Sequence, residues 1–453
     1  MSTDDSGRSV PPPPKGLGAV KRRAVTVNRE PAGEVENLHF ASDPAAVDQL
    51  NSEFYGKIKF PWPPQTFERY QRPDLWARLL AQDLGSWTEP LLPPDARIWV
   101  AGCGTNQALY TALKFPQAQV LGSDLSAESL AVAAANAQSL GVGNLELRNE
   151  SLNGAGYEGR FDYVICTGVI HHNADPVAAL GHLARALKPT GVLELMVYNR
   201  YHRIMTTSFQ NALWVLLGKP QKPDLARELP VARKFVTTFR EDCLMSAFLA
   251  PLAEATDASF ADTLLQPVEH SFTVETLEAA ATACDLDMVG FCNDVFSRTD
   301  GGADWNLQLA DPDLARLYAA LPDTQRWQVT NLLLAESSPM LWFYLQRRDC
   351  PRRRRPEQEL CEEFLAGRFT RVKTEKEVFF RRPDGGYDDH PMRLPFPGEP
   401  RNPLAKRVLA ALEEGAPLRE TLRRLDLSLP FPLINRLRLN LATSGGPFLE
   451  AVS

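Results

Sequence analysis

The sequence predicts an α/β fold: a doubly wound, mostly parallel sheet with a helical insertion and a small C-terminal α+β domain. Three observations support this fold class. Residues 98–126 contain an apolar run, a glycine turn, a helical stretch and a second apolar run that ends in a carboxylate. Short apolar runs then alternate with helical patterns up to Tyr198, which is typical of parallel strands joined by helices. The alternation stops after Tyr198, and a Pro and Arg-rich stretch at Cys350 marks the start of a separate tail.

Two segments precede the predicted sheet. Residues 1–38 combine a proline run with Ser, Gly and scattered Lys and Arg, a composition that buries too little apolar area to fold, so we expect a disordered tail. In residues 39–96, the aromatic pairs and prolines of Phe54–Tyr55 and Phe60–Pro64 stand ahead of a helical stretch at 75–84. We therefore predict a helical and aromatic cover at 39–96.

Periodicity predicts the elements of the sheet domain, 97–349. The predicted strands are 97–101, 119–123, 144–148, 161–167 and 191–198. The predicted helices between them are 105–114, 126–140 and 174–187. An insertion at 199–270 shows helical patterns around 204–217 and 240–254. After it we expect a helix from Phe272, a strand at 286–291 and a last strand at 340–345.

The tail at 350–453 predicts a small domain of short strands and helices. Its strands are expected at 369–372 and 377–380, and its helices at 403–414, 418–425 and 433–441. This order is winged-helix-like, and such domains bind nucleic acid in some proteins and only protein surfaces in others. The Arg352–Arg355 run ahead of it is most simply a solvated linker.

The glycine turn and the carboxylate after it predict a cofactor site. Gly102 and Gly104 let the backbone turn tightly, and the helix that begins near Thr105 directs unpaired N–H groups toward a ligand. Asp124, about 20 residues further on, is placed to accept hydrogen bonds from ribose hydroxyls. Gln107 occupies the place of the third glycine in the dinucleotide fingerprint, where its side chain would crowd a pyrophosphate. The pattern therefore favours S-adenosylmethionine, which has no phosphate, over NAD or a flavin dinucleotide.

Five segments, taken in order, resemble the class I S-adenosylmethionine-dependent methyltransferases. They are Ala101–Thr105, Gly122–Ser126, Asn149–Leu152, Phe161–His172 with Asp175–Pro176, and Leu187–Leu193. The resemblance covers about residues 50–346 and is nearest to a bacterial branch whose glycine turn also reads Ala-Gly-Cys-Gly-Thr. It implies a Rossmann-like fold with an antiparallel last strand, the cofactor S-adenosyl-L-methionine, and methyl transfer.

The resemblance also implies which residues hold the cofactor. They are Gly102, Gly104 and Asn106 at the methionine end, Asp124 and Leu125 at the ribose, Ser151 and Leu152 at the adenine, and Thr167 near the methionyl group. Family members usually carry an acidic residue in place of Val100, so backbone carbonyls or Asn106 would have to bind the methionyl ammonium. They often carry Asp in place of Ser151, so the adenine amino group would be held more weakly here or through the backbone. The alternative for Gly102 and Asp124 is an ordinary tight turn and an exposed carboxylate.

The chemistry implied is an in-line displacement from a sulfonium, in which alignment of the acceptor is the main task. It needs no metal, and a base helps only when the acceptor is a hydroxyl or a protonated amine. Candidate catalytic residues at the mouth of the predicted cleft are His171, His172, Tyr198 and His202, with Asn199 and His270 nearby. The paired histidines are interpreted either as a base or as a structural cap, and His270 as a buried partner.

In the wider superfamily, an insertion at 199–270 commonly supplies a substrate lid, and an aromatic segment like 39–96 often covers the cofactor. The alternatives are a stabilising helical cap for the insertion and packing on the outside of the sheet for the aromatic segment. The sequence thus predicts a methyltransferase that acts on O, N or C of a small or medium-sized metabolite beneath a lid. Two alternatives stay open: a protein or RNA methyltransferase that docks its substrate through the C-terminal domain, and a non-catalytic binding module, which Val100 favours.

Composition limits the partners and the location. A formal net charge of −7 argues against broad affinity for nucleic acid, and the C-terminal domain remains a candidate surface for a protein partner. No apolar run approaches the roughly 18 residues that a membrane helix needs, so we expect a cytoplasmic protein that does not bind membranes. The seven cysteines lack the close spacing of a zinc site and are interpreted as reduced core residues.

Overall fold

A computed structural model of the protein describes residues 43–58, 64–292 and 305–452. The predicted disordered tail at 1–38 and the aromatic stretch from Phe60 to Pro63 lie outside these ranges. The helices within these ranges are all too short or too polar to cross a membrane.

Seven strands form the central sheet, in the order β4-β3-β2-β5-β6-β8-β7. The strands are β2 (Arg97–Ala101), β3 (Gln119–Asp124), β4 (Leu145–Asn149), β5 (Phe161–Thr167), β6 (Leu187–Val197), β7 (Leu286–Phe291) and β8 (Leu341–Arg347). Hydrogen-bonded neighbours are parallel except at β8, which runs antiparallel to both β6 and β7. The predicted doubly wound, mostly parallel sheet with an antiparallel last strand is confirmed.

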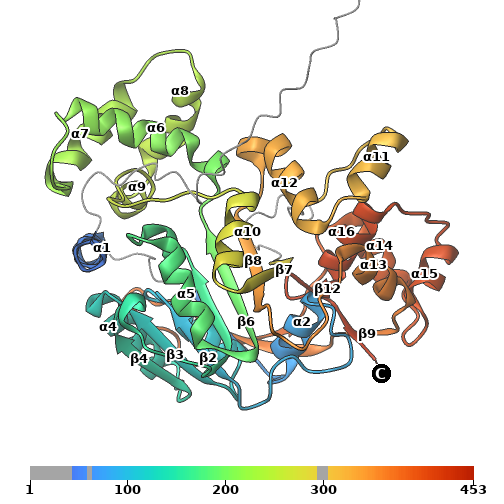
Figure 1. The fold of residues 1–453 in the computed structure, drawn as a ribbon. Coiled ribbons are helices and arrows are strands. Elements are labelled where there is room, and N and C mark those ends of the chain that lie inside the picture. The colour runs from blue at the N-terminus through green and yellow to red at the C-terminus, as the bar shows by residue number, and fades with distance from the viewer. Residues whose placement is uncertain (1–42, 59–63, 293–304, 453) are drawn as a thin grey trace, which may run out of the picture. The chain divides into compact units, whose positions relative to one another are not determined.

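Helices cover both faces of this sheet (Figure 1). On one face lie α5 (Pro176–Ala186) and α10 (Val274–Ala283), and on the other lie α2 (Leu75–Asp83), α3 (Gln107–Lys114) and α4 (Ala127–Ser139). The central strand β2 is buried on both sides, because Trp99 points into the core beneath α5 and α10 while Val100 points into the core beneath α2 and α3. A strand covered on both sides requires the continuous apolar run that the sequence shows at this place.

Short polar side chains fix the starts of three helices at one edge of the sheet. Ser126 caps α4 by accepting from Ser129 N. Asp175 caps α5 by accepting from two backbone N–H groups, and Pro176 follows at the first helical position. Asn199 caps the helix that follows β6. All three caps stand after the C-terminal ends of strands, the edge at which parallel sheets hold ligands.

Residues 199–270 form a group of helices that begins directly after β6 (Figure 1). Its members are α6 (Arg200–Leu216), α7 (Leu225–Thr238), α8 (Leu244–Leu249) with the 3₁₀ turn η3 (Ala250–Glu254), and α9 (Asp257–Leu264). They bury an apolar core of their own around Phe209, Ala232 and Phe260. The helix α1 (Pro44–Ile58) joins this core through Phe54. The predicted helical insertion is therefore present, and α1 packs against it.

The C-terminal residues form another core around Phe364, Phe369, Val408 and Leu437. Its helices are α13 (Glu357–Ala366), α14 (Pro403–Ala411), α15 (Leu418–Arg424) and α16 (Phe431–Leu441). Its short strands are β9 (Phe369–Arg371), β12 (Ala442–Thr443), β13 (Gly446–Pro447) and β14 (Leu449–Ala451). Before it, between β7 and β8, stand α11 (Pro312–Ala319) and α12 (Asp323–Leu334).

Segments from the two ends of the chain pair with each other. The strand β1 (Thr66–Tyr70) pairs antiparallel with β10 (Thr374–Phe380), which pairs in turn with β11 (Met392–Phe396). Gln82 on α2 donates to Ala442 O and Leu449 O and accepts from Ala451 N. The predicted cover at 39–96 and the predicted domain at 350–453 thus share a sheet and buried hydrogen bonds. The boundary at Cys350 stays a prediction.

Limited proteolysis is expected to cut at Arg353 or Arg354, because both side chains are exposed in a stretch outside any helix or strand. We expect the two fragments to stay associated, since their separation would break the β1–β10 pairing and the bonds of Gln82. Size-exclusion chromatography of the nicked protein, with and without denaturant, checks this result. Fragments that separate without denaturant would show that the tail folds independently.

Candidate functional site

The glycine turn between β2 and α3 packs closely against its neighbours. Gly102 and Gly104 have left-handed backbone, with φ of 68° and 54°. Gly102 N and Cys103 N donate to Ser123 O over 2.8 and 2.9 Å. A Cβ on Gly102 would lie 2.3 Å from Val169 Cγ2, on the loop after β5. The position therefore requires glycine both for its conformation and for its space.

Asp124 ends β3 directly beside this turn. Its Oδ2 accepts from Gly104 N and its Oδ1 from Ser126 N, each over 2.8 Å. Burial raises the pKa of the Asp124 carboxyl, and the bonds from backbone N–H groups act in the opposite direction. Each carboxylate oxygen has a further lone pair, so Asp124 can accept from two neighbouring hydroxyls in addition.

On the other side of the turn, α3 is tied to β5. Gln107 Nε2 donates to Thr167 Oγ1 over 2.6 Å. Asn106 precedes Gln107 and is buried. Val100 is fully buried among apolar side chains, so it presents no polar group to a ligand.

The helix α1 lies over the ends of β3 and β4. Ser52 Oγ donates to Leu125 O over 3.3 Å, and Ser151 Oγ donates to Asp48 Oδ2 over 2.5 Å. The structure thus brings the predicted cofactor residues to one edge, at the C-terminal ends of β2 to β5. These residues are Gly102, Gly104, Asn106, Asp124, Leu125, Ser151, Leu152 and Thr167.

The paired histidines form a buried 3₁₀ turn, η2 (Ile170–His172), after β5. The His171 ring stacks on Tyr198 with 3.9 Å between ring centres, and neither of its nitrogens has a hydrogen-bond partner among the described residues. His172 Nδ1 lies 2.7 Å from Val268 O, so Nδ1 carries the proton and donates. Burial lowers the pKa of His171 well below its ordinary value and that of His172 to about 4. Both rings are therefore neutral near pH 7.

Tyr198 and His202 come from the start of the insertion. Burial raises the pKa of the Tyr198 hydroxyl above its ordinary value. His202 is half-buried on α6, where burial lowers its pKa and a backbone hydrogen bond at Ser338 opposes that effect. Of the four predicted catalytic residues, the structure brings His171, His172 and Tyr198 into ring contact, while His202 forms a hydrogen bond with the backbone of Ser338.

A buried ion pair lies next to the Tyr198 ring. Arg203 Nε and Nη2 each donate to the Glu269 carboxylate over 2.6 Å, and the two side chains are 10% and 1% exposed. The Arg203 guanidinium carbon lies 4.3 Å from the centre of the Tyr198 ring. This bidentate pair joins α6 to the segment that leads to His270.

Asp262 on α9 is a second acid beneath the insertion helices. Tyr55 on α1 donates from its hydroxyl to Asp262 Oδ1 over 3.3 Å. Burial raises the pKa of Asp262 to about 6, against the lowering effect of Arg203. No sequence motif marks Asp262 or the Arg203–Glu269 pair, because their partners lie 207 and 66 residues away.

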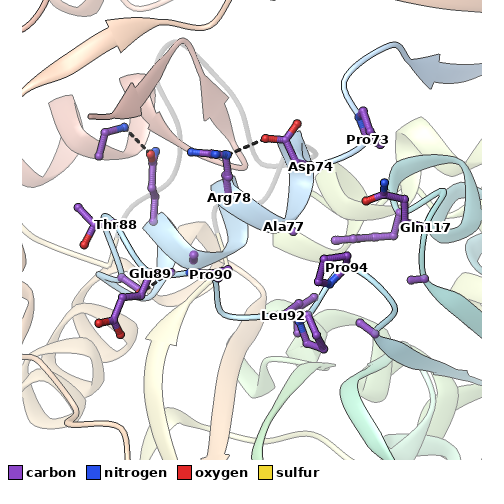
Figure 2. Close-up of a pocket in the computed structure, with 18 of the residues that line it drawn as sticks. Pro73, Asp74, Ala77, Arg78, Thr88, Glu89, Pro90, Leu92, Pro94 and Gln117 are labelled. Atoms are coloured by element: carbon purple, nitrogen blue, oxygen red, sulfur yellow. Dashed lines mark hydrogen bonds and ion pairs between the residues drawn. The ribbon is translucent and has the colours of Figure 1, made fainter. Parts of the chain in front are cut away.

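A cavity of about 210 Å³ opens at the opposite edge of the sheet (Figure 2). Its lining includes Ala96 and Ala118, which precede β2 and β3, and the prolines Pro90 and Pro94. Beside it, Arg78 pairs with Asp74 over 2.6 Å. None of the residues that line this cavity belongs to the site built around Asp124.

The described residues contain no cluster of three or more side chains that could hold a metal ion.

Comparison with known proteins supports the interpretation of the chain as a methyltransferase. A family model described as a methyltransferase domain matches residues 99–193. An uncharacterized protein of Synechococcus sp. is 29% identical over 318 residues, which are 67% of this chain and 73% of that protein. The ubiquinone biosynthesis O-methyltransferase of Cereibacter sphaeroides is 31% identical over 135 residues, which are 29% of this chain and 53% of that enzyme. The match therefore spans about half the length of the ubiquinone enzyme.

The solved structure of PKMT2 from Rickettsia typhi in complex with AdoHcy shares the fold. The superposition covers 83% of this chain and 76% of that one, with a TM-score of 0.54 and 15% sequence identity. Residues 99–193 therefore match a methyltransferase domain, and the chain has the fold of the class I S-adenosylmethionine-dependent methyltransferases. In this methyltransferase, the matched residues 99–193 include the glycine turn, Asp124 and the paired histidines.

The donors and acceptors at this edge fit S-adenosyl-L-methionine. Asp124 offers lone pairs to two vicinal hydroxyls, and the turn at Gly102 presents backbone in place of side chains. Leu125 and Leu152 follow the ends of β3 and β4, and Leu152 is buried in the core of the sheet. The role of each single residue stays a prediction.

Replacing Gly102 by alanine is expected to weaken binding of S-adenosylhomocysteine at least tenfold, because a Cβ there displaces Val169 and with it the turn. Gly141→Ala is the matched control, since Gly141 also has positive φ, 63°, but open space around its Cβ position. Both variants should lose about 1–2 kcal/mol of stability through backbone strain. Calorimetry and thermal unfolding of both variants separate strain from displacement, and equal affinities in the two would contradict the expectation.

Proposed function

We propose that this methyltransferase moves a methyl group from S-adenosyl-L-methionine to O, N or C of a small or medium-sized metabolite that binds beneath α6–α9. The observation that carries the proposal is the contact of His171 and Tyr198, which joins the loop after β5 to the start of the insertion. The acceptor would lie against these rings, next to the glycine turn.

The insertion supports a lid role because it is a folded body and not an open loop. It has its own apolar core, and the buried Arg203–Glu269 pair holds α6 against the chain that returns to the sheet. A body of this kind can exclude water from a small acceptor. The ubiquinone biosynthesis enzymes that match part of this chain are O-methyltransferases by name, which also favours a small acceptor.

The cofactor would supply a methyl group on an already activated sulfonium, so the residues of the chain need to align the acceptor and, for O or N acceptors, to take up its proton. His172 is weakly suited to that proton, because its pKa is about 4. Asp262, with a pKa of about 6, is closer to the working pH. We therefore propose that His171, His172 and Tyr198 position the acceptor and that Asp262 accepts the proton.

The pH dependence of turnover tests these roles. The wild-type rate is expected to fall about tenfold per pH unit below pH 6, because a base of that pKa must be ionised to act. Asp262→Asn should lose this acid limb and about a hundredfold or more in rate, whereas His172→Asn should keep the limb. An Asp262→Asn variant with an unchanged limb would exclude Asp262 as the base.

Two measurements test the proposed function itself. Calorimetry should show binding of S-adenosylhomocysteine and no binding of NAD; no heat with the adenosyl ligand would favour a non-catalytic module. Mass spectrometry of a metabolite extract incubated with the protein and the cofactor should then show products heavier by one methyl group. Methylation confined to protein or RNA fractions in parallel incubations would replace the small acceptor by a macromolecular one.

A further inference from the structure

We infer that Asp48, on α1, is the residue that recognises the exocyclic amino group of adenine in the cofactor. The inference rests on the proposed function, since it names a contact within the same cofactor site. The acceptor for the adenine amino group would thus come from a helix outside the central sheet and not from the strand ends.

The position of α1 places Asp48 at the adenine end of the site. Ser52, one turn further along α1, donates to Leu125 O, directly after Asp124. Asn51 Nδ2 donates to His172 O over 2.7 Å, which holds the same helix against the loop after β5. α1 is thus attached on both sides of the predicted ligand position, and Asp48 lies at the end of β4.

The Asp48 carboxylate is held in place by two donors. Ser151 Oγ donates to its Oδ2 over 2.5 Å, and Asn153 Nδ2 donates to its Oδ1 over 3.1 Å. These bonds orient the half-buried carboxylate and use one lone pair on each oxygen, so acceptor capacity remains. The adenine amino group is a hydrogen-bond donor and needs such an acceptor.

Ser151 itself is a poor hydrogen-bond acceptor for that amino group. Its hydroxyl proton is committed to Asp48, and its oxygen also accepts from Asn153 N over 3.0 Å. Three other acids at this edge have different partners. Asp124 is held by backbone N–H groups beside the predicted ribose position, Glu128 accepts from the Ser126 hydroxyl, and Glu150 accepts from a tyrosine hydroxyl. Asp48 is therefore the best-placed acceptor for the adenine edge.

A simpler role for Asp48 would be to fasten α1 to the loop after β4. The two roles differ in one respect. If Asp48 only attaches α1, its removal weakens the affinity for every adenosyl ligand by the same factor. If Asp48 recognises the amino group, its removal weakens the affinity only for ligands that carry this group.

The test compares S-adenosylhomocysteine with its 6-deamino analogue, in which purine replaces adenine and only the amino group is lost. Calorimetry on the full-length wild-type protein should give an affinity about tenfold to a hundredfold lower for the analogue, the range for a lost hydrogen bond to a charged group. In Asp48→Ala the two ligands should bind with nearly equal affinity.

Ser52→Ala is the matched control, because it removes a contact of α1 with Leu125 but leaves the Asp48 carboxylate in place. It should weaken both ligands by the same factor and keep their ratio. If the ratio of the two ligand affinities in Asp48→Ala equals that of the wild type, the inference is overturned and Asp48 only attaches α1 to the loop after β4. A wild-type protein that binds neither ligand would instead refute the proposed function.

Discussion

Replacing Glu269 by alanine is expected to lower the free energy of unfolding by about 3–5 kcal/mol, because the change removes the hydrogen-bonded carboxylate partner of the buried Arg203. This loss of stability should occur only when one partner of the ion pair is removed and the other stays charged. Arg203→Met combined with Glu269→Leu replaces both charges by apolar side chains and should stay near wild-type stability. Urea denaturation of the single and double variants measures both effects.

An exposed ion pair provides the contrast. Asp313 and Arg316 are paired on α11, with both side chains 78% exposed. Asp313→Ala should leave the urea midpoint nearly unchanged, because solvent screens such pairs. A Glu269→Ala variant that is as stable as Asp313→Ala would mean that water reaches the Arg203 side chain beneath the insertion.

The contribution of His172 to the free energy of unfolding is expected to fall by about 3 kcal/mol as the pH falls from about 6.5 to 4. The native pKa of about 4 lies below the ordinary value of 6.5, so the unfolded chain takes up this proton at a higher pH than the native protein does. The contribution is therefore fully present above pH 6.5 and lost as the pH approaches 4. Burial acts in the same direction on His171, His202 and His270.

His172→Asn isolates this contribution, because an amide N–H can still donate to Val268 O but does not titrate. The gap in unfolding free energy between the wild type and His172→Asn should narrow by about 3 kcal/mol between pH 7 and pH 4. A gap that is constant across this range would show that His172 is solvated in the native protein.

Asp83→Asn should show the opposite dependence. Burial raises the pKa of the Asp83 carboxyl to about 6, above its ordinary 3.8, despite bonds from Ser444 and Tyr344. Its contribution to stability is present at low pH and lost as the pH rises through 6, so the variant should gain relative to the wild type over that rise. The two variants together show which sign dominates the total profile.

Local patterns were enough to predict the sheet. The strand predicted at 161–167 and the strand predicted at 286–291 coincide with β5 and β7, because each is a short apolar run between helical patterns. The glycine turn and Asp124 were equally visible, since the backbone conformation and the ligand chemistry both depend on residues close together in sequence.

Helices with weak local signals were not predicted. α7 contains Pro230, which lacks a backbone donor and therefore predicts a break in the helix. The helix nevertheless continues past Pro230, because Ala232 and Val236 are buried in the core of the insertion. The single helical pattern at 240–254 is divided in the structure into α8 and a 3₁₀ turn, where Pro251 lies near the division. Tertiary packing decided both outcomes.

The sequence by itself determined the class of the protein: a parallel sheet, a glycine turn without a third glycine, and a carboxylate at the end of the second strand of that sheet. Only the tertiary structure decided which side chains surround the site. Asp48 meets Ser151 and Tyr55 meets Asp262 across 103 and 207 residues, and β1 meets β10 across most of the chain. Hydrophobic periodicity reports the burial of a segment but not its partner, so contacts between distant segments emerge only when the chain packs.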